Sequence, residues 1–148
     1  MAKRILVPLD ASGDSEDVID LIANAARGGG ATVRLLHVCP YAENIVDVDG
    51  RVIAYADQET ARLQNEATDY LSRVALRFDG AVVERVVRFG EAVTEILLES
   101  EAVGADLIAM TARRRQRLSQ FVLGTTADQV CRRTDVAVLL VRPTPTHA

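Results

Sequence analysis

Short apolar segments alternate with amphipathic segments along the whole chain. Five near-continuous apolar runs cover residues 4–9, 31–38, 81–89, 105–111 and 136–141. Runs of this length, bounded by turn residues, are typical of buried β-strands. Between them, apolar positions recur at helical spacing, as Val18, Ile19 and Ile22 do after Asp10. The spacing predicts one helix there, with Ser12, Asp14 and Ser15 as N-cap candidates, and three more helices over residues 57–78, 91–103 and 124–134.

The order of these elements predicts an α/β fold. Strands that alternate with helices form a parallel sheet with helices on both faces, and doubly covered strands are apolar throughout. The chain has 148 residues and shows neither an internal repeat nor a composition break, so residues 1–148 are predicted to form a single domain. The longest connection, residues 39–56, is predicted to be an irregular loop, and loops of this length are often functional or mobile.

Composition narrows the function classes. The formal net charge is −4, whereas nucleic-acid binders usually carry a basic domain, so DNA is not an expected partner. The four arginines within residues 113–117 are therefore a local positive spot on an acidic chain. No apolar run approaches the roughly 18 residues of a membrane span. The start MAKRILVPLD is a poor signal peptide. A cytoplasmic protein without membrane association is expected.

Few residues in the sequence suggest a catalytic site or a metal site. The two cysteines and two histidines show neither disulfide-scaffold nor metal-site spacing, so no metal site is predicted. No acid–base pair and no activated nucleophile emerges. A phosphoacceptor aspartate at Asp10 would need further acids beside it, and the predicted third strand ends in Phe89 and Gly90 instead. An enzyme is not expected.

A ligand site is expected beyond the carboxyl ends of the strands, where open α/β sheets bind their ligands. Asp10 follows the first strand and could accept hydrogen bonds from an amino group or a ribose hydroxyl, or could simply cap the first helix. The candidate residues at these strand ends are Pro8, Leu9, Asp10, Val38, Met110 and Thr111.

The start of the last helix is a second candidate. Gly124, Thr125 and Thr126 precede or open it, and a helix N-terminus with small residues can bind phosphate. The alternative is ordinary N-capping by either threonine. The GxxxxGK[ST] and GxGxxG fingerprints of other nucleotide binders are absent.

These segments together resemble the universal stress protein family over almost the whole chain. The resemblance is carried by ILVPLDAS, LLHV, VVRFGEAVTEIL, ADLIAMT and LSQFVLGTTADQVCRRTDVAVLLVRP. It implies an adenine-nucleotide-binding fold, a Rossmann-like sandwich of the adenine-nucleotide-hydrolase type, with five parallel strands in the order 3-2-1-4-5. It also implies a homodimer paired through the last strand, Ala137 to Arg142.

ATP-binding members of that family carry a glycine motif, which this chain matches in part. The motif reads Gly, two residues, Gly, nine residues, then Gly and Ser or Thr. Gly124 and Thr125 match its last pair, whereas Thr111 and Arg114 stand where the first two glycines belong. Arg114 could grip phosphate bidentately, or it could fill the space that glycine leaves open.

Two functions follow from this partial match. One is a stress-response module that binds ATP, AMP or a related phosphate ligand. The other is a dimeric interaction module of the same fold that binds no ATP because its glycine motif is altered.

Overall fold

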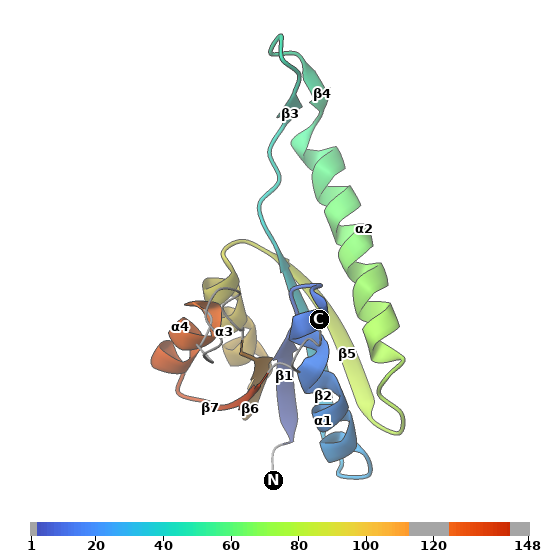
Figure 1. Cartoon of the computed structure of the whole chain (residues 1–148), viewed down its shortest axis with the longest axis vertical. Coiled ribbons are helices and arrows are strands. Elements are labelled where there is room, and N and C mark those ends of the chain that lie inside the picture. Colours follow the sequence, from blue (N-terminus) through green and yellow to red (C-terminus); the bar gives the residue numbers. More distant parts are fainter. Residues whose placement is uncertain (1–2, 113–124, 143–148) are drawn as a thin grey trace, which may run out of the picture.

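The computed structural model describes residues 3–112 and 125–142, and they form a three-layer α/β sandwich (Figure 1). In chain order its elements are β1 Arg4–Pro8, the 3₁₀ turn η1 Gly13–Glu16, α1 Asp17–Ala26, β2 Thr32–Cys39, β3 Ile45–Val46, β4 Val52–Ala54, α2 Ala56–Ala75, β5 Val82–Phe89, α3 Ala92–Val103, β6 Leu107–Thr111, α4 Thr125–Arg133 and β7 Ala137–Val141. The five long strands make one sheet in the order β5-β2-β1-β6-β7. Counted within that sheet the order is 3-2-1-4-5, which confirms the order implied by the resemblance.

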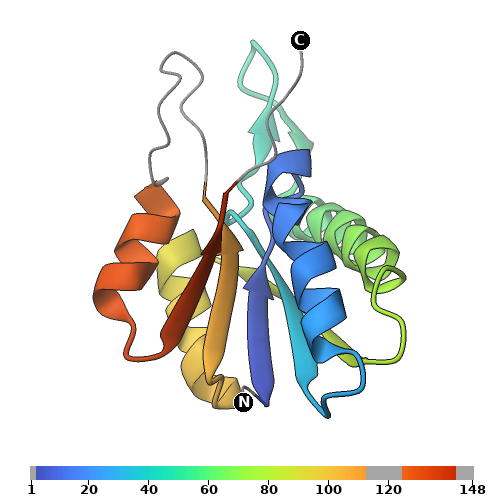
Figure 2. The ribbon, with the colours of Figure 1, turned by 60° about the horizontal axis from the view of Figure 1, so that its bottom comes forward.

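The helices cover both faces of the sheet, as the alternating pattern predicts (Figure 2). On one face α1 and α2 pack over a core that includes Val7, Ile19 and Leu71. On the other face α3 and α4 pack over a core that includes Leu6, Ile108 and Val130. Side chains on both faces of β1 are therefore withdrawn from water, which explains why its sequence is apolar without alternation.

All pairings in the large sheet are parallel, so every carboxyl end lies along the same edge. The register runs from Arg4 opposite Thr32 to Pro8 opposite Leu36 between β1 and β2. Between β6 and β7 it ends with Thr111 opposite Val141. Because β1 is central, the segment after it meets the segments after β2 and β6. None of the helices within the described part of the chain is long and apolar enough to cross a membrane.

Several element boundaries differ from the predicted ones. The second helix stops at Ala75, although Phe78 beyond it is still buried against the same core. The predicted N-caps of the first helix are wrong. Glu16 occupies the N-cap position of α1, while the Ser12 hydroxyl accepts from the Ser15 N–H one turn earlier, at the 3₁₀ turn. An apolar stripe shows which residues pack against the core. It can continue past the end of a helix when the following loop also packs there, as Phe78 does.

The connection over residues 39–56 is a β-hairpin rather than an irregular loop. β3 and β4 pair antiparallel and are joined by a tight turn. One carboxylate oxygen of Asp47 accepts from the backbone N–H groups of Asp49 and Arg51, and Gly50 adopts a positive φ of 79°. The hairpin and the first turns of α2 project from the body of the molecule (Figure 1). Below, β3, β4 and the turn between them are called the arm.

A charged cluster joins α3 to the strands beneath it. Glu99 is 3% exposed and accepts from Arg34 Nη1 and Arg88 Nε, both at 2.6 Å. Arg34 also pairs with Glu84 at 3.2 Å, and Arg88 pairs with Glu95 at 3.3 Å. Burial by itself would raise the pKa of Glu99, but the hydrogen bonds from both arginines outweigh it and hold the pKa below its ordinary value. The carboxylate is therefore ionised where it lies.

Candidate functional site

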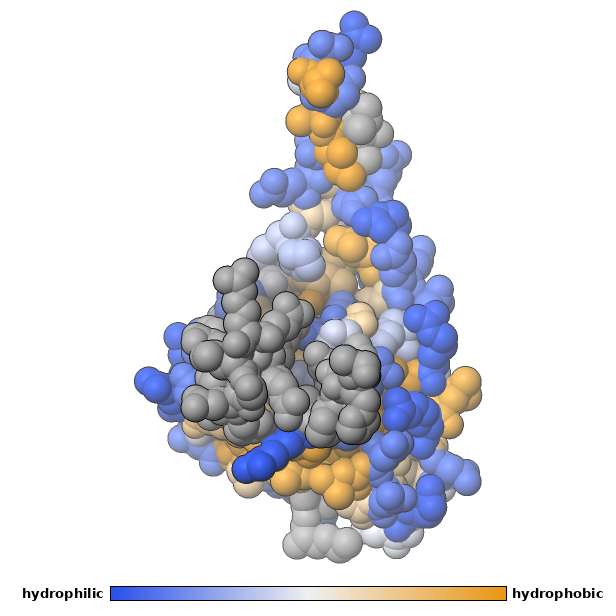
Figure 3. All heavy atoms as spheres, viewed as in Figure 1, coloured by the Kyte–Doolittle hydropathy of each residue, from blue (hydrophilic) through white to orange (hydrophobic). Residues whose placement is uncertain are grey.

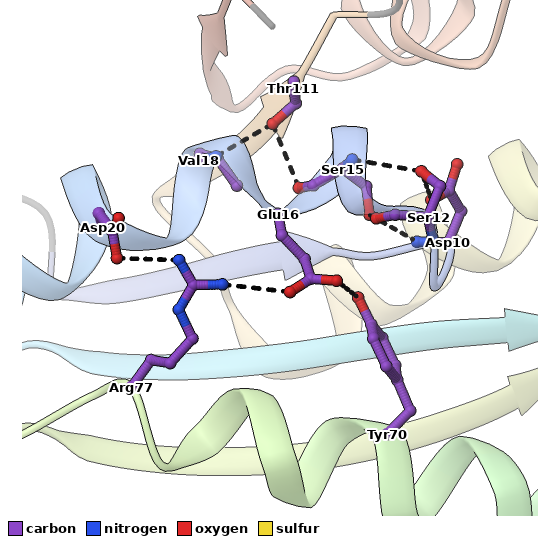
Figure 4. A network of polar contacts seen from close by, with 9 residues as sticks. All are labelled: Asp10, Ser12, Ser15, Glu16, Val18, Asp20, Tyr70, Arg77 and Thr111. Atoms are coloured by element: carbon purple, nitrogen blue, oxygen red, sulfur yellow. Dashed lines mark hydrogen bonds and ion pairs between the residues drawn. The ribbon is translucent and has the colours of Figure 1, made fainter. Parts of the chain in front are cut away.

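The carboxyl edge of the sheet brings together Asp10 and Thr111, which are a hundred positions apart in the sequence. Both contact Ser15, at the start of the first helical segment (Figure 4). The Asp10 N–H donates to the Ser15 hydroxyl at 3.3 Å. The Thr111 hydroxyl donates to the Ser15 carbonyl oxygen at 3.2 Å. The structure thus places the strand-one and strand-four candidates at one site.

Asp10 shapes the loop that follows β1. Its Oδ1 accepts from the Ser12 backbone N–H at 2.9 Å and from the Ser12 hydroxyl at 2.6 Å. Ala11 between them has a φ of 69°, a left-handed conformation that costs a residue with a Cβ roughly 1–2 kcal/mol. Asp10 remains exposed to solvent. The aspartate therefore holds a strained turn and still presents its carboxylate at the sheet edge.

Thr111 has both hydrogen-bonding roles of its hydroxyl engaged. In addition to donating to Ser15, its Oγ1 accepts from the Val18 N–H at 3.1 Å. Val18 lies in the first turn of α1, where helical N–H groups lack a partner within the helix. Glu16, at the N-cap position, makes no capping bond there, so Thr111 supplies it from β6. The side chain that stands in place of the first motif glycine therefore fastens α1 to the sheet.

The remaining strand-end candidates are apolar and lie on opposite faces of the sheet. Leu9 is buried in the core under α1 and α2. Met110 is buried on the other face, and the half-buried Val38 packs beside it. Pro8, the last residue of β1, is half-buried. Pro8 and Val38 keep part of their surface exposed and could contact an uncharged ring, whereas Leu9 and Met110 belong to the two cores.

Two neighbours of the site, His37 and Tyr70, were not predicted as functional. His37 Nδ1 donates to the Leu9 carbonyl oxygen at 2.7 Å, and its ring lies in a T-shaped arrangement with the Tyr70 ring, with centroids 6.0 Å apart. The Tyr70 hydroxyl donates to Glu16 Oε2 at 3.3 Å. Burial, reinforced by the charge of Glu16, raises the pKa of Tyr70 to about 12. Because Tyr70 falls on the apolar stripe of α2, sequence reasoning assigns it to the core alone.

Glu16 continues this network away from the sheet edge. Arg77 Nη1 donates to Glu16 Oε1 at 3.1 Å, and Arg77 Nη2 donates to Asp20 at 3.0 Å. The first turn of α1 is therefore held by α2 on one side and by β6 on the other (Figure 4). These contacts anchor the helical segment that follows the loop after β1.

The phosphate half of the candidate site is described only in part. Thr125 is the first residue of α4, and Thr126 beside it is half-buried. Arg114 and Gly124 lie outside the described residues. An α-helix that starts at this sheet edge offers backbone N–H groups and a partial positive charge to an anion.

Cys39, at the end of β2, shows no sign of reactivity. It is buried, and burial together with the charge of Glu66 raises the pKa of its thiol. The thiolate is the nucleophilic form, so a raised pKa leaves the group inert. The residues described at this edge suit the binding of a ligand with an apolar ring, hydrogen-bond donors and an anionic end.

Comparisons with known proteins identify the family and the fold. A model described as the universal stress protein family matches residues 1–142. Universal stress protein G of Shigella flexneri is 28% identical over 145 residues, which cover 96% of this chain and 100% of that protein. A solved universal stress protein in complex with cAMP has a TM-score of 0.64 and 18% identity, and the match covers 97% of this chain and 98% of that chain. The universal stress protein from Archaeoglobus fulgidus in complex with dAMP has a TM-score of 0.60 and 18% identity, covering 93% and 96%.

Proposed function

Because this chain belongs to the universal stress protein family, we propose that it is a stress-response module that binds an adenine nucleotide at the carboxyl edge of its sheet. The observation that carries the proposal is the convergence of Asp10 and Thr111 on Ser15 beside the apolar strand ends. Two proteins of the same fold were solved with adenine nucleotides, cAMP and dAMP. Asp10 would accept from the ribose hydroxyls or the adenine amino group, and the ring would lie against Val38.

The proposed ligand carries a single phosphate group. The start of α4, with Thr125 and Thr126, would receive that phosphate. Longer phosphate chains need the close backbone approach that glycine permits. Here Thr111 and Arg114 replace two motif glycines, and the Thr111 hydroxyl is already committed to Ser15 and Val18. AMP and cAMP are therefore the proposed ligands, ahead of ATP.

Isothermal titration calorimetry with AMP, cAMP and ATP tests the proposal. The informative variant is Asp10→Asn, because its amide oxygen can still accept from Ser12 while the charge is lost. A hydrogen bond to a charged group contributes about 1.5–3 kcal/mol, so affinity should fall roughly ten- to a hundredfold. Asp69→Asn, at an exposed position of α2, is the matched control and should bind as the parent does. Equal affinity of Asp10→Asn and the parent would place the ligand elsewhere.

The second candidate function is a dimeric interaction module without a nucleotide. The observation that favours it is the internal use of the Thr111 hydroxyl, which ties β6 to α1. Under this alternative none of the three nucleotides releases heat or raises the melting temperature. Arg114→Gly then tests why no nucleotide binds. The substitution creates ATP affinity if the arginine side chain blocks the phosphates.

Both functions share a proposed homodimer through β7 in a cytoplasmic protein. β7 is the last strand of the sheet order, and its residues Val138 to Val141 are apolar yet only half-buried. An apolar edge strand left uncovered favours aggregation, and pairing with the same strand of a second chain covers it. Both cysteines are free, as expected for proteins kept in a reducing compartment.

A further inference from the structure

β5 lies at one edge of the large sheet, opposite to the edge formed by β7. Within the described residues it pairs with β2 alone, in a parallel register that runs without a shift from Val82 to Phe89. β5 spans eight residues, whereas β7 spans five. An edge strand presents a row of main-chain groups to which a further strand can bind.

The directions of these main-chain groups follow from the bonds between β5 and β2. The N–H of Gly90, the residue after the strand, donates to the Cys39 carbonyl oxygen at 2.9 Å, so Gly90 faces β2. In a parallel ladder each residue directs both of its main-chain groups to one side, and the side alternates along the strand. The residues of β5 that face away from β2 are Val83, Arg85, Val87 and Phe89. None of the described residues bonds these outward groups.

We propose that β5 pairs antiparallel with β5 of a second copy of this chain, around a two-fold axis at Val86. This register sets Arg85 opposite the partner's Val87, and Val83 opposite the partner's Phe89. All of these residues direct their main-chain groups outward, so each pair can exchange two hydrogen bonds. The two five-stranded sheets thereby join into one continuous sheet.

The charged side chains of β5 are complementary in this register. Charges on an edge strand commonly oppose pairing. Here Glu84 comes to lie opposite the partner's Arg88, on the face of the sheet where α3 packs. The two residues form a non-hydrogen-bonded pair, in which side chains approach most closely. Opposite charges placed directly across two strands stabilise their pairing.

Both side chains keep atoms for this contact. Glu84 accepts from Arg34 through Oε2, and its side chain is 47% exposed. Arg88 donates to α3 through Nε and Nη1, and its side chain is 28% exposed. Glu84 Oε1 and Arg88 Nη2 take part in none of the contacts between described residues. They are the atoms that would meet across the axis.

The charges also favour this axis over the neighbouring ones. An axis at Arg85 would set that arginine opposite its own copy, and like charges directly opposite are destabilising. An axis at Val87 would set Glu84 opposite the partner's Gly90, so the ion pair would be lost. Because β5 and β7 are opposite edges of the sheet, the proposed contact is separate from pairing through β7. A chain that forms both contacts assembles beyond a dimer.

A disulfide across the axis tests the register. Val86 lies opposite its own copy in a non-hydrogen-bonded pair, with Cα atoms about 4.5 Å apart, which a disulfide can span. Val86→Cys in the full chain, oxidised with copper phenanthroline, should give covalent dimers on a non-reducing gel. The control is Val82→Cys, at a more exposed position that the register places opposite the partner's Gly90. It should give no more dimer than the parent, which contains Cys39 and Cys131. Equal dimer yields from the two variants would overturn the proposal.

Charge reversal tests the contact in solution without a cross-link. Glu84→Arg opposes the partner's Arg88 with a like charge, so the molar mass should fall at least twofold from that of the parent. The mass is measured by light scattering after gel filtration at equal concentration, and circular dichroism checks that the variant is folded. Glu101→Arg makes the same change of charge at an exposed position of α3 and should keep the mass of the parent. An unchanged mass of folded Glu84→Arg, or an equal loss in both variants, would contradict the β5 contact.

The arm is another source of association, and the same measurements distinguish it. Val48 in its turn is fully exposed, and apolar residues gather on this projecting end of the molecule (Figure 3). Under the proposal Val48→Ser keeps the mass of the parent. A lower mass in Val48→Ser but not in Glu84→Arg would assign association to the arm and overturn the proposal. Neither readout needs a nucleotide, so failure of the proposed nucleotide binding leaves both tests intact.

Discussion

Replacing Glu99 by glutamine tests how much the charged cluster under α3 stabilises the fold. Glu99 is almost fully buried and bridges Arg34 and Arg88 at 2.6 Å each. Glutamine has nearly the same shape, so Glu99→Gln removes the charge without opening a cavity. One of its two acceptor oxygens becomes an amide group, which cannot accept from an arginine. The variant therefore loses one hydrogen bond outright and weakens the other.

The expected cost follows from these contacts. Hydrogen bonds to charged groups contribute about 1.5–3 kcal/mol each. Two such bonds give an upper bound of roughly 3–6 kcal/mol, which applies only if both arginines were left buried without a partner. Arg34 keeps Glu84 and Arg88 keeps Glu95, and both arginine side chains are about a quarter exposed. The unfolding free energy should therefore fall by about 2 kcal/mol at neutral pH, lowering the melting temperature by about 4–8 °C.

The cost should depend on pH in one direction. The pKa of Glu99 is lowered in the folded protein, so the unfolded chain binds its proton first as the pH falls. Its stabilisation is complete above the unfolded value near 4.3 and is lost as the pH drops through the folded pKa. Glutamine does not titrate in this range. The difference in unfolding free energy between the parent and Glu99→Gln should thus shrink below about pH 4.

Urea unfolding followed by circular dichroism, at neutral and at acidic pH, measures both quantities. Glu101→Gln, at an exposed position of the same helix, is the matched control and should change the unfolding free energy by less than about 0.5 kcal/mol. A cost of Glu99→Gln as small as that of the control would refute the reasoning. So would a cost that stays constant as Glu99 protonates.

Three other substitutions address the site and the proposed dimer. Ala11→Gly relieves the left-handed conformation at φ 69° and should raise the urea midpoint, with a net gain of up to about 1 kcal/mol, whereas Ala61→Gly within α2 should lower it by a similar amount. Thr111→Val leaves the Val18 N–H and the Ser15 carbonyl oxygen without their partner, so the unfolding free energy measured in urea should fall by about 1–3 kcal/mol. A loss as small as that of Thr68→Val, at an exposed position of α2, would contradict the capping role. Val141 directs its carbonyl oxygen toward Ala112, so Val138, three residues earlier, directs its N–H outward from the β7 edge. Val138→Pro removes that N–H and should lower the molar mass measured by gel filtration with light scattering. An unchanged mass counts against pairing through β7.

A parallel sheet could be anticipated from the apolar strands, because both faces of the central strands are covered, whereas the strand order came from the family resemblance. Apolar runs such as residues 4–9 and 136–141 have no other stable place in a chain this size. The arm was missed, although the alternation in IVDVDGRVIA around Asp49 and Gly50 is a hairpin signal. The long-loop interpretation took precedence over a pattern only a few residues long.

The details of the candidate site depend on contacts that local patterns do not encode. Parallel topology predicts that Asp10 and Thr111 share one edge of the sheet. Thr111 caps α1 through Val18, which lies 93 positions away in the sequence. The Glu16 side chain does not cap the helix itself, because it points toward Tyr70 and Arg77. Glu99 likewise looks like a solvated helix position until its two arginines are found on neighbouring strands.

The central position of β1 also determines when the candidate site can exist. β1 pairs on one side with β2, which follows about 30 residues later in the sequence. On its other side it pairs with β6, where Ile5 lies opposite Leu107. During synthesis from the N-terminus, β1, β2 and β5 can assemble before β6 leaves the ribosome. Thr111 arrives only with β6, so the first turn of α1 stays uncapped until most of the chain has been made. A ligand bound at this edge would therefore report that the whole chain has folded, and it would stabilise the last step of that process.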